Sequence, residues 1–126
     1  MVFIKYENIT SDIIKSFYKV YNVLGYGFLE KVYENALSLE LKKMGYKVEV
    51  QKSIDVYYEK EIVGKYFADL LVEDKIILEL KAVENFRKEH KYQLINYLKA
   101  TEIEVGLLLN FGEKPEFKRI IFSKNL

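Results

Sequence analysis

Outside its turn, the mostly apolar stretch DLLVEDKIILELKA carries three charged side chains, Asp69, Glu79 and Lys81. The leucines and isoleucines around them are typical of buried strands. Two carboxylates beside a lysine can hold a divalent cation and stabilise negative charge on a phosphate. The alternative is a wet hairpin face with an ordinary salt bridge, which contributes little stability. Spacing alone leaves both interpretations open, because a short D…E-x-K pattern recurs by chance.

The turn between the two strands decides whether Asp69 joins the other charges. Glu79 and Lys81 are two residues apart, so in a strand they face the same side. A two-residue turn would direct Asp69 away from Glu79. A three-residue turn, Glu73 to Lys75, would pair the two acids at about 5 Å between Cβ atoms. We therefore predict an odd-length turn or a β-bulge here, because the site requires one.

Paired carboxylates at this distance repel each other unless a positive group lies between them. Lys81 supplies part of that charge, and a divalent cation would supply more. Ligands that are all oxygen favour Mg²⁺ or Mn²⁺ over zinc. Such a metal polarises a phosphate and lowers the pKa of its bound water. Lys81 would orient that water or stabilise the developing charge.

Two further stretches carry polar residues at helical spacing. GFLEKVY places Glu30 and Tyr33 near the start of a predicted helix, where Glu30 also suits the helix dipole. HKYQLINYL places His90, Gln93 and Tyr97 on one polar and aromatic stripe. Gln93 and Tyr97 are suited to bonding phosphates or base edges. The alternative for this stripe is a helix rim that faces water, with His90 simply exposed.

The elements that must position these residues are predicted in the order α, α, β, β, β, α, β, β. Apolar residues at helical spacing predict helices over about 11–24, 29–44 and 87–100. Thr10 or Ser11 is expected to cap the first helix, and Gly45 to end the second.

Strand signals fill the rest of the chain. Stretches rich in valine, tyrosine and isoleucine predict a three-stranded antiparallel meander, with EKE (59–61) and EDK (73–75) as its turns. The apolar run 104–111 predicts a strand covered on both faces, and 117–123 an edge strand. Strands with helices before and between them predict a mixed sheet with helices packed on it.

Composition narrows the class of protein. The 126 residues suggest one domain, and the absence of cysteine excludes disulfides and thiolate metal sites. No apolar run approaches the roughly 20 residues of a membrane span, so a cytoplasmic location is the default expectation and no membrane partner is expected. The net charge of +1 produces no strong field, so contact with nucleic acid would need a local patch. The 11 tyrosines and 8 phenylalanines are expected in the hydrophobic core and at its edges. Aromatic side chains exposed at these edges would suit contact with a second copy of the chain, in a homodimer, or with a partner protein.

Together the motifs resemble a known family. The Gly27–Tyr33 run, G-x-x-E-x-x-Y, resembles the signature of the GxxExxY family. The D…E-x-K set resembles the PD-(D/E)XK nuclease superfamily, to which that family is similar. The Gln93-x-x-x-Tyr97 pair is similar to a motif found after the catalytic strand in RecB- and Cas4-type members. The resemblance covers about residues 5 to 124, with one departure: no proline precedes Asp69, where the local run is YFAD.

The resemblance implies a restriction-endonuclease-like α/β (α+β) core, with a mixed central sheet of about five strands flanked by helices, in a single domain over residues 1–126. It implies a hydrolase, a Mg²⁺- or Mn²⁺-dependent nuclease that cleaves phosphodiester bonds of nucleic acid, with DNA as the expected partner. Asp69, Glu79 and the Leu80 carbonyl would hold the metal. Lys81 would position the water, and Glu30 would assist a metal or orient Lys81.

The resemblance also implies a substrate side. Gln93 and Tyr97 would shape it, with His90 and Tyr33 as weaker candidates. A different function class stays open: a catalytically silent nucleic-acid-binding or protein-interaction module that retains the nuclease fold, favoured by the near-neutral charge and small size. A third is a structural cation site without turnover. The intact acidic pair and lysine favour the enzyme, because a purely structural module gains nothing from paired carboxylates.

Overall fold

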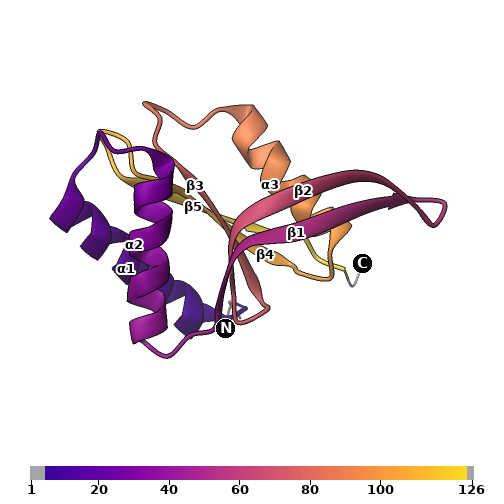
Figure 1. Cartoon of the computed structure of the whole chain (residues 1–126), viewed down its shortest axis with the longest axis horizontal. Helices are drawn as coiled ribbons and strands as arrows, with labels where there is room; N and C mark the ends of the chain where they lie inside the picture. Colours follow the sequence, from indigo (N-terminus) through magenta and orange to yellow (C-terminus); the bar gives the residue numbers. More distant parts are fainter. Residues whose placement is uncertain (1–4, 125–126) are drawn as a thin grey trace, which may run out of the picture.

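The computed structural model describes residues 5–124, and in that part three helices and five strands follow the predicted order. The elements are α1 (Glu7–Leu24), α2 (Glu30–Lys43), β1 (Val48–Tyr58), β2 (Glu61–Val72), β3 (Ile76–Lys81), α3 (Lys88–Ala100), β4 (Val105–Asn110) and β5 (Glu116–Ile121). They form one sheet flanked by helices, which confirms the restriction-endonuclease-like core (Figure 1). None of the helices in residues 5–124 is long and apolar enough to cross a membrane.

The sheet is mixed, as predicted. Its strand order is β1-β2-β3-β4-β5, and neighbours run antiparallel except for β3 and β4, which are parallel and joined by α3. Every residue of β4 is buried, which confirms the prediction of a strand covered on both faces. β5 forms one edge of the sheet, also as predicted.

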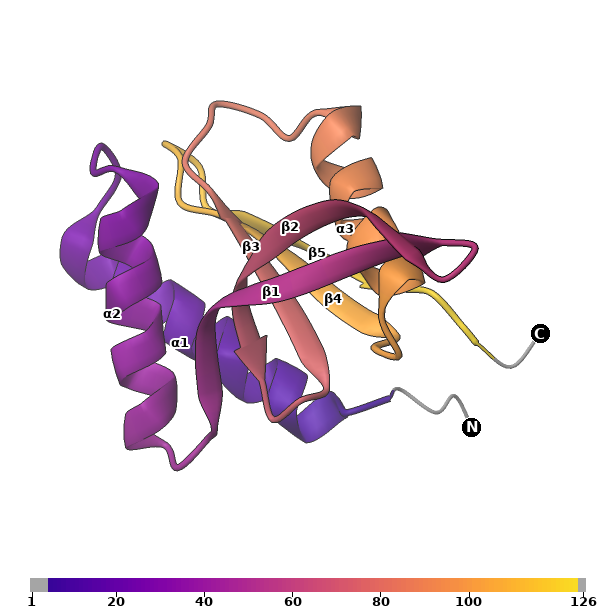
Figure 2. The same cartoon turned by 45° about the vertical axis from the view of Figure 1, so that its right-hand side comes forward.

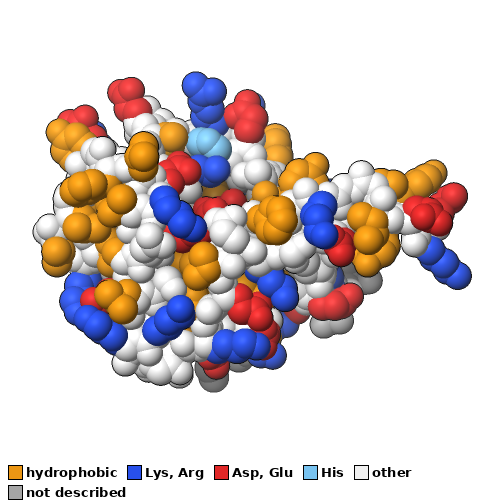
Figure 3. Space-filling model, in the orientation of Figure 1, with side chains coloured by type: hydrophobic (Ala, Val, Ile, Leu, Met, Phe, Trp, Pro, Cys, Tyr) orange, Lys and Arg blue, Asp and Glu red, His pale blue; other side chains and the backbone are white. Residues whose placement is uncertain are grey.

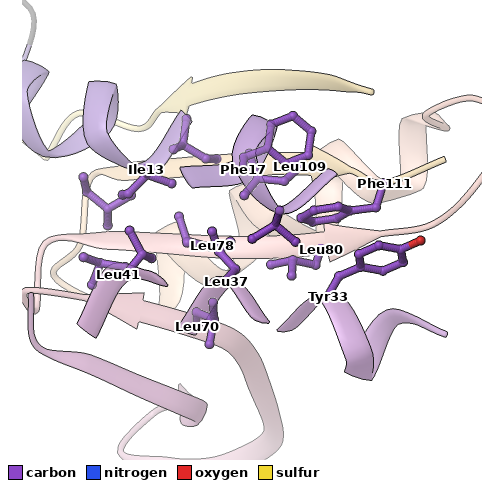
Figure 4. Close-up of a cluster of buried hydrophobic side chains, with 14 of the residues drawn as sticks. Ile13, Phe17, Tyr33, Leu37, Leu41, Leu70, Leu78, Leu80, Leu109 and Phe111 are labelled. Atoms are coloured by element: carbon purple, nitrogen blue, oxygen red, sulfur yellow. The ribbon is translucent and has the colours of Figure 1, made fainter. Parts of the chain in front are cut away.

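Helices cover both faces of the sheet. α1 and α2 bury one set of apolar side chains against it, while α3 buries another set on the opposite face. Figure 4 shows the larger cluster, in which Ile13 and Phe17 of α1 and Leu37 of α2 meet leucines of the sheet. Apolar side chains at helical spacing produce this arrangement, because each helix has one stripe to remove from water. The charged residues of β2 and β3 are therefore held between two helical layers.

The first helix begins earlier than predicted. It starts at Glu7 with Tyr6 as the N-terminal cap, and Tyr6 forms no side-chain capping bond. Thr10 donates its backbone N–H to the Tyr6 carbonyl at 2.9 Å and lies buried inside the helix, so neither Thr10 nor Ser11 is a cap. Ile9 packs against the core in the added turn, which favours the longer helix. Gly45, with a φ of 92°, follows the end of α2 as predicted.

β1 and β2 extend beyond the rest of the sheet. β2 pairs with β3 only over Leu70–Val72, so its first part and the end of β1 project as a two-stranded arm (Figure 1). The turn at its tip has two residues, Glu59 and Lys60, with φ values of 49° and 71°. It is one residue shorter than the predicted EKE turn. Two positive φ values match the twist of a hairpin, so Glu61 is already part of β2.

Candidate active site

The turn between β2 and β3 decides which residues oppose each other in this hairpin. It contains three residues, Glu73–Lys75, which confirms the predicted odd length. The ladder ends at the pair of Leu70 with Leu78. In the same register Asp69 and Glu79 are the next opposing residues, so both carboxylates lie where the two strands stop pairing.

Beyond the last pair, side-chain oxygens take the place of backbone carbonyls as acceptors. The backbone N–H of Asp69 donates to Oε2 of Glu79 at 2.8 Å. The backbone N–H of Leu80 donates to Oδ2 of Asp69, also at 2.8 Å. Hydrogen bonds from N–H groups to carboxylates are among the stronger ones in proteins. Each acid is therefore fixed against the opposite strand, and the two acids border one gap, here called the β2–β3 gap.

The alternation of side chains along β2 reverses at Asp69. Leu70 packs in the core under α1 and α2, whereas Ala68, two residues earlier, packs on the α3 side. In a regular strand these two residues would face the same side. The reversal coincides with Gln51 of β1, which stands opposite Asp69 in the register and has a φ of 51°. The direction of Asp69 is therefore set by this distortion as well as by the turn length.

The electrostatics of the gap favour a positive occupant. Glu79 is only 3% exposed, and burial together with the nearby Asp69 charge raises its pKa to about 8. Burial also raises the pKa of Asp69, and the charge of Lys81 opposes the shift of both acids. A divalent cation between the acids would offset the same desolvation and repulsion. The all-oxygen donor set therefore fits a hard cation such as Mg²⁺ or Mn²⁺.

Glu30 reaches the gap from α2. It is the first residue of that helix, and its Oε2 accepts a hydrogen bond at 3.1 Å from the backbone N–H of Ala82, directly after β3. The loop before it contains Gly27, whose φ of 111° is readily adopted only by glycine. Glu30 thus lies at the end of β3 beside the gap, and its assistance to a metal or to Lys81 stays a prediction.

Tyr33 does not lie on a substrate-accessible surface. Its side chain is 0% exposed, and its ring stacks on Phe111 with centroids 4.4 Å apart (Figure 4). Its hydroxyl donates to the Gly25 carbonyl at 2.6 Å and accepts from the Phe28 N–H at 3.2 Å. The prediction that Tyr33 contacts the substrate is therefore wrong. Its place in the G-x-x-E-x-x-Y run is explained by the loop it holds, which leads into Glu30.

Two residues of the gap were not singled out from the sequence. Glu34, one turn after Glu30 and only 3% exposed, accepts a hydrogen bond from Nε2 of Gln51 at 2.6 Å and pairs with Lys31 at 2.6 Å. Gln51 Nε2 also lies 3.4 Å from Oδ1 of Asp69. These side chains border a cavity of about 200 Å³ that Asp69 also lines. Glu34 could have been found from the sequence, because it is a charged residue on the apolar stripe of α2. No local pattern in the sequence marks Gln51.

The predicted stripe of α3 lies on the other side of the gap. Gln93, His90 and Tyr97 line a groove between α3 and the projecting hairpin. Tyr97 is 5% exposed, and burial with the charges of Glu79 and Asp69 raises its pKa to about 12. His90 accepts the backbone N–H of Arg87 through Nδ1 at 3.0 Å, and burial and the Lys81 charge lower its pKa. Of the stripe, Tyr97 therefore lies near the two acids and His90 near Lys81, while Gln93 lines the groove.

The acids of the β2–β3 gap would supply only part of the ligands of a bound metal ion. No three acidic or histidine side chains within residues 5–124 form a complete cation site by themselves. Two carboxylates and a backbone carbonyl suit Mg²⁺, which usually keeps several waters and takes further oxygens from a phosphate substrate. Figure 3 shows acidic side chains in a hollow on this face, with basic side chains beside them. Acids with basic side chains beside them are the kind of arrangement that suits a cation and a phosphate group.

Comparison with known proteins gives one family match. The family model of the PD-(D/E)XK nuclease superfamily matches residues 7–120. No curated protein matches the chain significantly.

Two solved structures share the fold. The crystal structure of SSO0001 is similar with a TM-score of 0.59 and 20% identity, covering 96% of this chain. The chain spans only 62% of the length of SSO0001. An alkaline exonuclease, LHK-Exo from Laribacter hongkongensis, is similar with a TM-score of 0.55 and 14% identity, over 96% of this chain and 73% of its own. Supported by the family match over nearly its whole length, the chain belongs to the PD-(D/E)XK nuclease superfamily.

Proposed function

We propose that this protein is a Mg²⁺- or Mn²⁺-dependent nuclease that hydrolyses phosphodiester bonds of DNA. The observation that carries the proposal is the β2–β3 gap, where Asp69 and Glu79 are each anchored to the opposite strand. Lys81 follows on the same strand as Glu79. A buried glutamate beside a half-buried aspartate is costly to keep unless the pair has a charged ligand to bind, so a metal-binding role accounts for it better than a structural one.

Asp69 and Glu79 would hold the metal, with the Leu80 carbonyl as a further ligand. The Leu80 N–H points to Asp69, and the N–H and carbonyl of one strand residue share an edge, so this carbonyl faces the same gap. Glu30 borders the site closely enough to assist. When bound, the cation would polarise the phosphate and lower the pKa of a bound water.

The remaining residues act on the water and the phosphate. Lys81 is a flexible point charge next to both acids, suited to orienting the attacking water and offsetting negative charge in the transition state. Gln51 donates a hydrogen bond to Asp69 from the α2 side, and Glu34 in turn accepts one from Gln51. Gln93 and Tyr97, with His90, contact the nucleic acid from the α3 side.

The test is cleavage of labelled single-stranded, duplex and branched DNA, with single-stranded RNA as a further substrate, in Mg²⁺, Mn²⁺ or EDTA. Lys81→Ala is the test variant, and Lys42→Ala, an exposed lysine at the far end of α2, is its control. We expect metal-dependent cleavage of DNA that Lys81→Ala loses and Lys42→Ala keeps. Binding without cleavage in every metal would instead identify a silent binding module, and preferential cleavage of RNA would correct the substrate.

A further inference from the structure

A groove of about 880 Å³ runs between α3 and the projecting β1–β2 hairpin, which lie beside each other in Figures 1 and 2. Its volume falls within the range of about 300–1,000 Å³ of pockets that hold small organic groups. Tyr66 lines it from β2, and Tyr92, Gln93, Asn96 and Tyr97 line it from α3. We call this surface the arm groove. It is larger than the cavity on the α2 side and differs from it in chemistry.

The lining of the arm groove is aromatic and amide-rich. Tyr66 is 49% exposed and Tyr92 is 58% exposed, so both present ring surface to solvent. The Tyr66 ring rests on Tyr97 at 5.8 Å between centroids, which holds it in place. Exposed rings along a groove are platforms for nucleic-acid bases, and amide side chains bond base edges. A duplex hides its base faces within its own stack, so such platforms suit unpaired bases.

Two residues that line the arm groove lie near the charged residues of the β2–β3 gap. Tyr97 and His90 both line the groove, and Tyr97 feels the charges of Glu79 and Asp69 while His90 feels that of Lys81. A strand lying in the groove would therefore come close to the carboxylates at Tyr97. Four of the lining residues are tyrosines, and two amides and one imidazole add polar atoms, a combination that suits the flat faces and polar edges of nucleic-acid bases. Nearness to the acids and the lining chemistry both favour nucleic acid over a protein partner.

We propose that the arm groove binds an unpaired segment of DNA, with bases stacked on Tyr66 and Tyr92, and leads it to the acids of the β2–β3 gap. The substrate is then single-stranded DNA or the unpaired part of a branched molecule. This inference rests on the proposed nuclease function of the gap. It adds which form of DNA is bound and which residues recognise it.

The test measures DNA binding in a Lys81→Ala background, so that cleavage does not interfere. Fluorescence anisotropy of a labelled oligodeoxythymidine is compared with that of a blunt duplex. Tyr66→Ala should weaken single-strand binding by roughly 5- to 150-fold, the loss expected for one base–aromatic stack. Phe67→Ala is the matched control, since Phe67 is the next residue, is 51% exposed and faces the other side of β2.

Two more variants separate stacking from folding. Tyr66→Phe keeps the ring and should bind single strands as well as the background protein. Tyr92→Ala changes an exposed side chain on α3 and should weaken single-strand binding even if Tyr66→Ala unfolds. The inference would be overturned if Tyr92→Ala bound single strands as tightly as the background protein. It would also be overturned if Phe67→Ala lost as much affinity as Tyr66→Ala, or if the duplex bound as tightly as the single strand.

The two proposals fail in different ways. If the native protein cleaves DNA while the tyrosine variants bind and cleave single strands normally, the arm groove inference is wrong and the nuclease proposal stands. If no substrate is cleaved in any metal but single-strand binding depends on Tyr66 and Tyr92, the groove is a binding site and the nuclease proposal is wrong.

Discussion

The two sides of the β2–β3 gap are built differently. On the α2 side, a cavity of about 200 Å³ is lined mainly by charged and amide side chains that bond to one another. On the α3 side, the arm groove of about 880 Å³ is lined mainly by tyrosines and amides whose surfaces are partly exposed. The α2 side is therefore small, charged and tightly bonded, and the α3 side is wide, nearly neutral and open.

This difference separates two tasks. Groups that hold a cation need fixed geometry, which hydrogen bonds from neighbouring side chains provide. Groups that hold a nucleic acid need accessible rings and donors, which a bonded and buried cluster cannot offer. The α2 side should therefore control metal binding and turnover, while the α3 side controls substrate affinity. Variants on the two sides should change different measured quantities.

The largest effect is expected within the gap itself. Lys81→Met removes the positive charge but keeps much of the side-chain volume, and should lower the single-turnover cleavage rate by roughly 100- to 1,000-fold. Single-strand affinity in EDTA should change little, because the arm groove is intact. Lys42→Met serves as the control. A cleavage rate within about threefold of the native protein would exclude Lys81 from the chemistry.

A smaller effect is expected from the bonded network on the α2 side. Gln51→Ala removes the contacts to Glu34 and Asp69, and should raise the metal concentration needed for binding by roughly 10- to 100-fold. Mn²⁺ binding followed by electron paramagnetic resonance measures this without activity. Lys52→Ala, at the adjacent position of β1, is the control. If Gln51→Ala weakened single-strand affinity and left metal affinity unchanged, the division between the two sides would be refuted.

The raised pKa of Glu79 should make the free energy of unfolding depend on pH. The pKa of Glu79 is raised from 4.5 to about 8, so the metal-free folded protein binds this proton more tightly than the unfolded chain. The resulting stabilisation is complete below about pH 4.5 and is lost as the pH rises through about 8. Glu79→Gln carries no such charge and should be more stable than the native protein at pH 8.5, by about 1–2 kcal/mol.

Urea unfolding at pH 5 and pH 8.5 in EDTA checks this. The gain of Glu79→Gln over the native protein should shrink at pH 5, where Glu79 is protonated. Saturating Mg²⁺ at pH 8.5 should stabilise the native protein more than the variant, which keeps Asp69 but lacks the second carboxylate. The assignment would be contradicted if the stability of Glu79→Gln relative to the native protein were lower at pH 8.5 than at pH 5.

The smallest effect concerns the loop that carries Glu30. Tyr33→Phe deletes the hydroxyl that bonds Gly25 and Phe28 but keeps the ring on Phe111, and should lower the free energy of unfolding by about 1 kcal/mol. Tyr26→Phe is the control, because Tyr26 is 60% exposed. Urea unfolding measures both variants. Equal stability of Tyr33→Phe and Tyr26→Phe would mean that the hydroxyl does not stabilise the loop.

Much of the fold was predictable because it depends on local periodicity. Helical and strand spacing located the elements, and the requirement that Asp69 oppose Glu79 correctly predicted an odd turn at Glu73–Lys75. The start of α1 was mispredicted because packing of Ile9 outweighed the capping preference of Thr10. Tyr33 was mispredicted because a tyrosine on a helix has the same spacing whether it faces solvent or the core.

The sequence by itself determined which charged residues could act together, because spacing and strand periodicity are properties of neighbouring residues. It left two lengths open for the turn between β2 and β3, and the structure has the three-residue turn. Only the tertiary structure decided the direction of Asp69, the contact of Glu34 with Gln51, and the arm groove. Each of these arises between elements far apart in the chain. Their positions depend on the distortion at Gln51 and on how the helices pack, neither of which local spacing encodes.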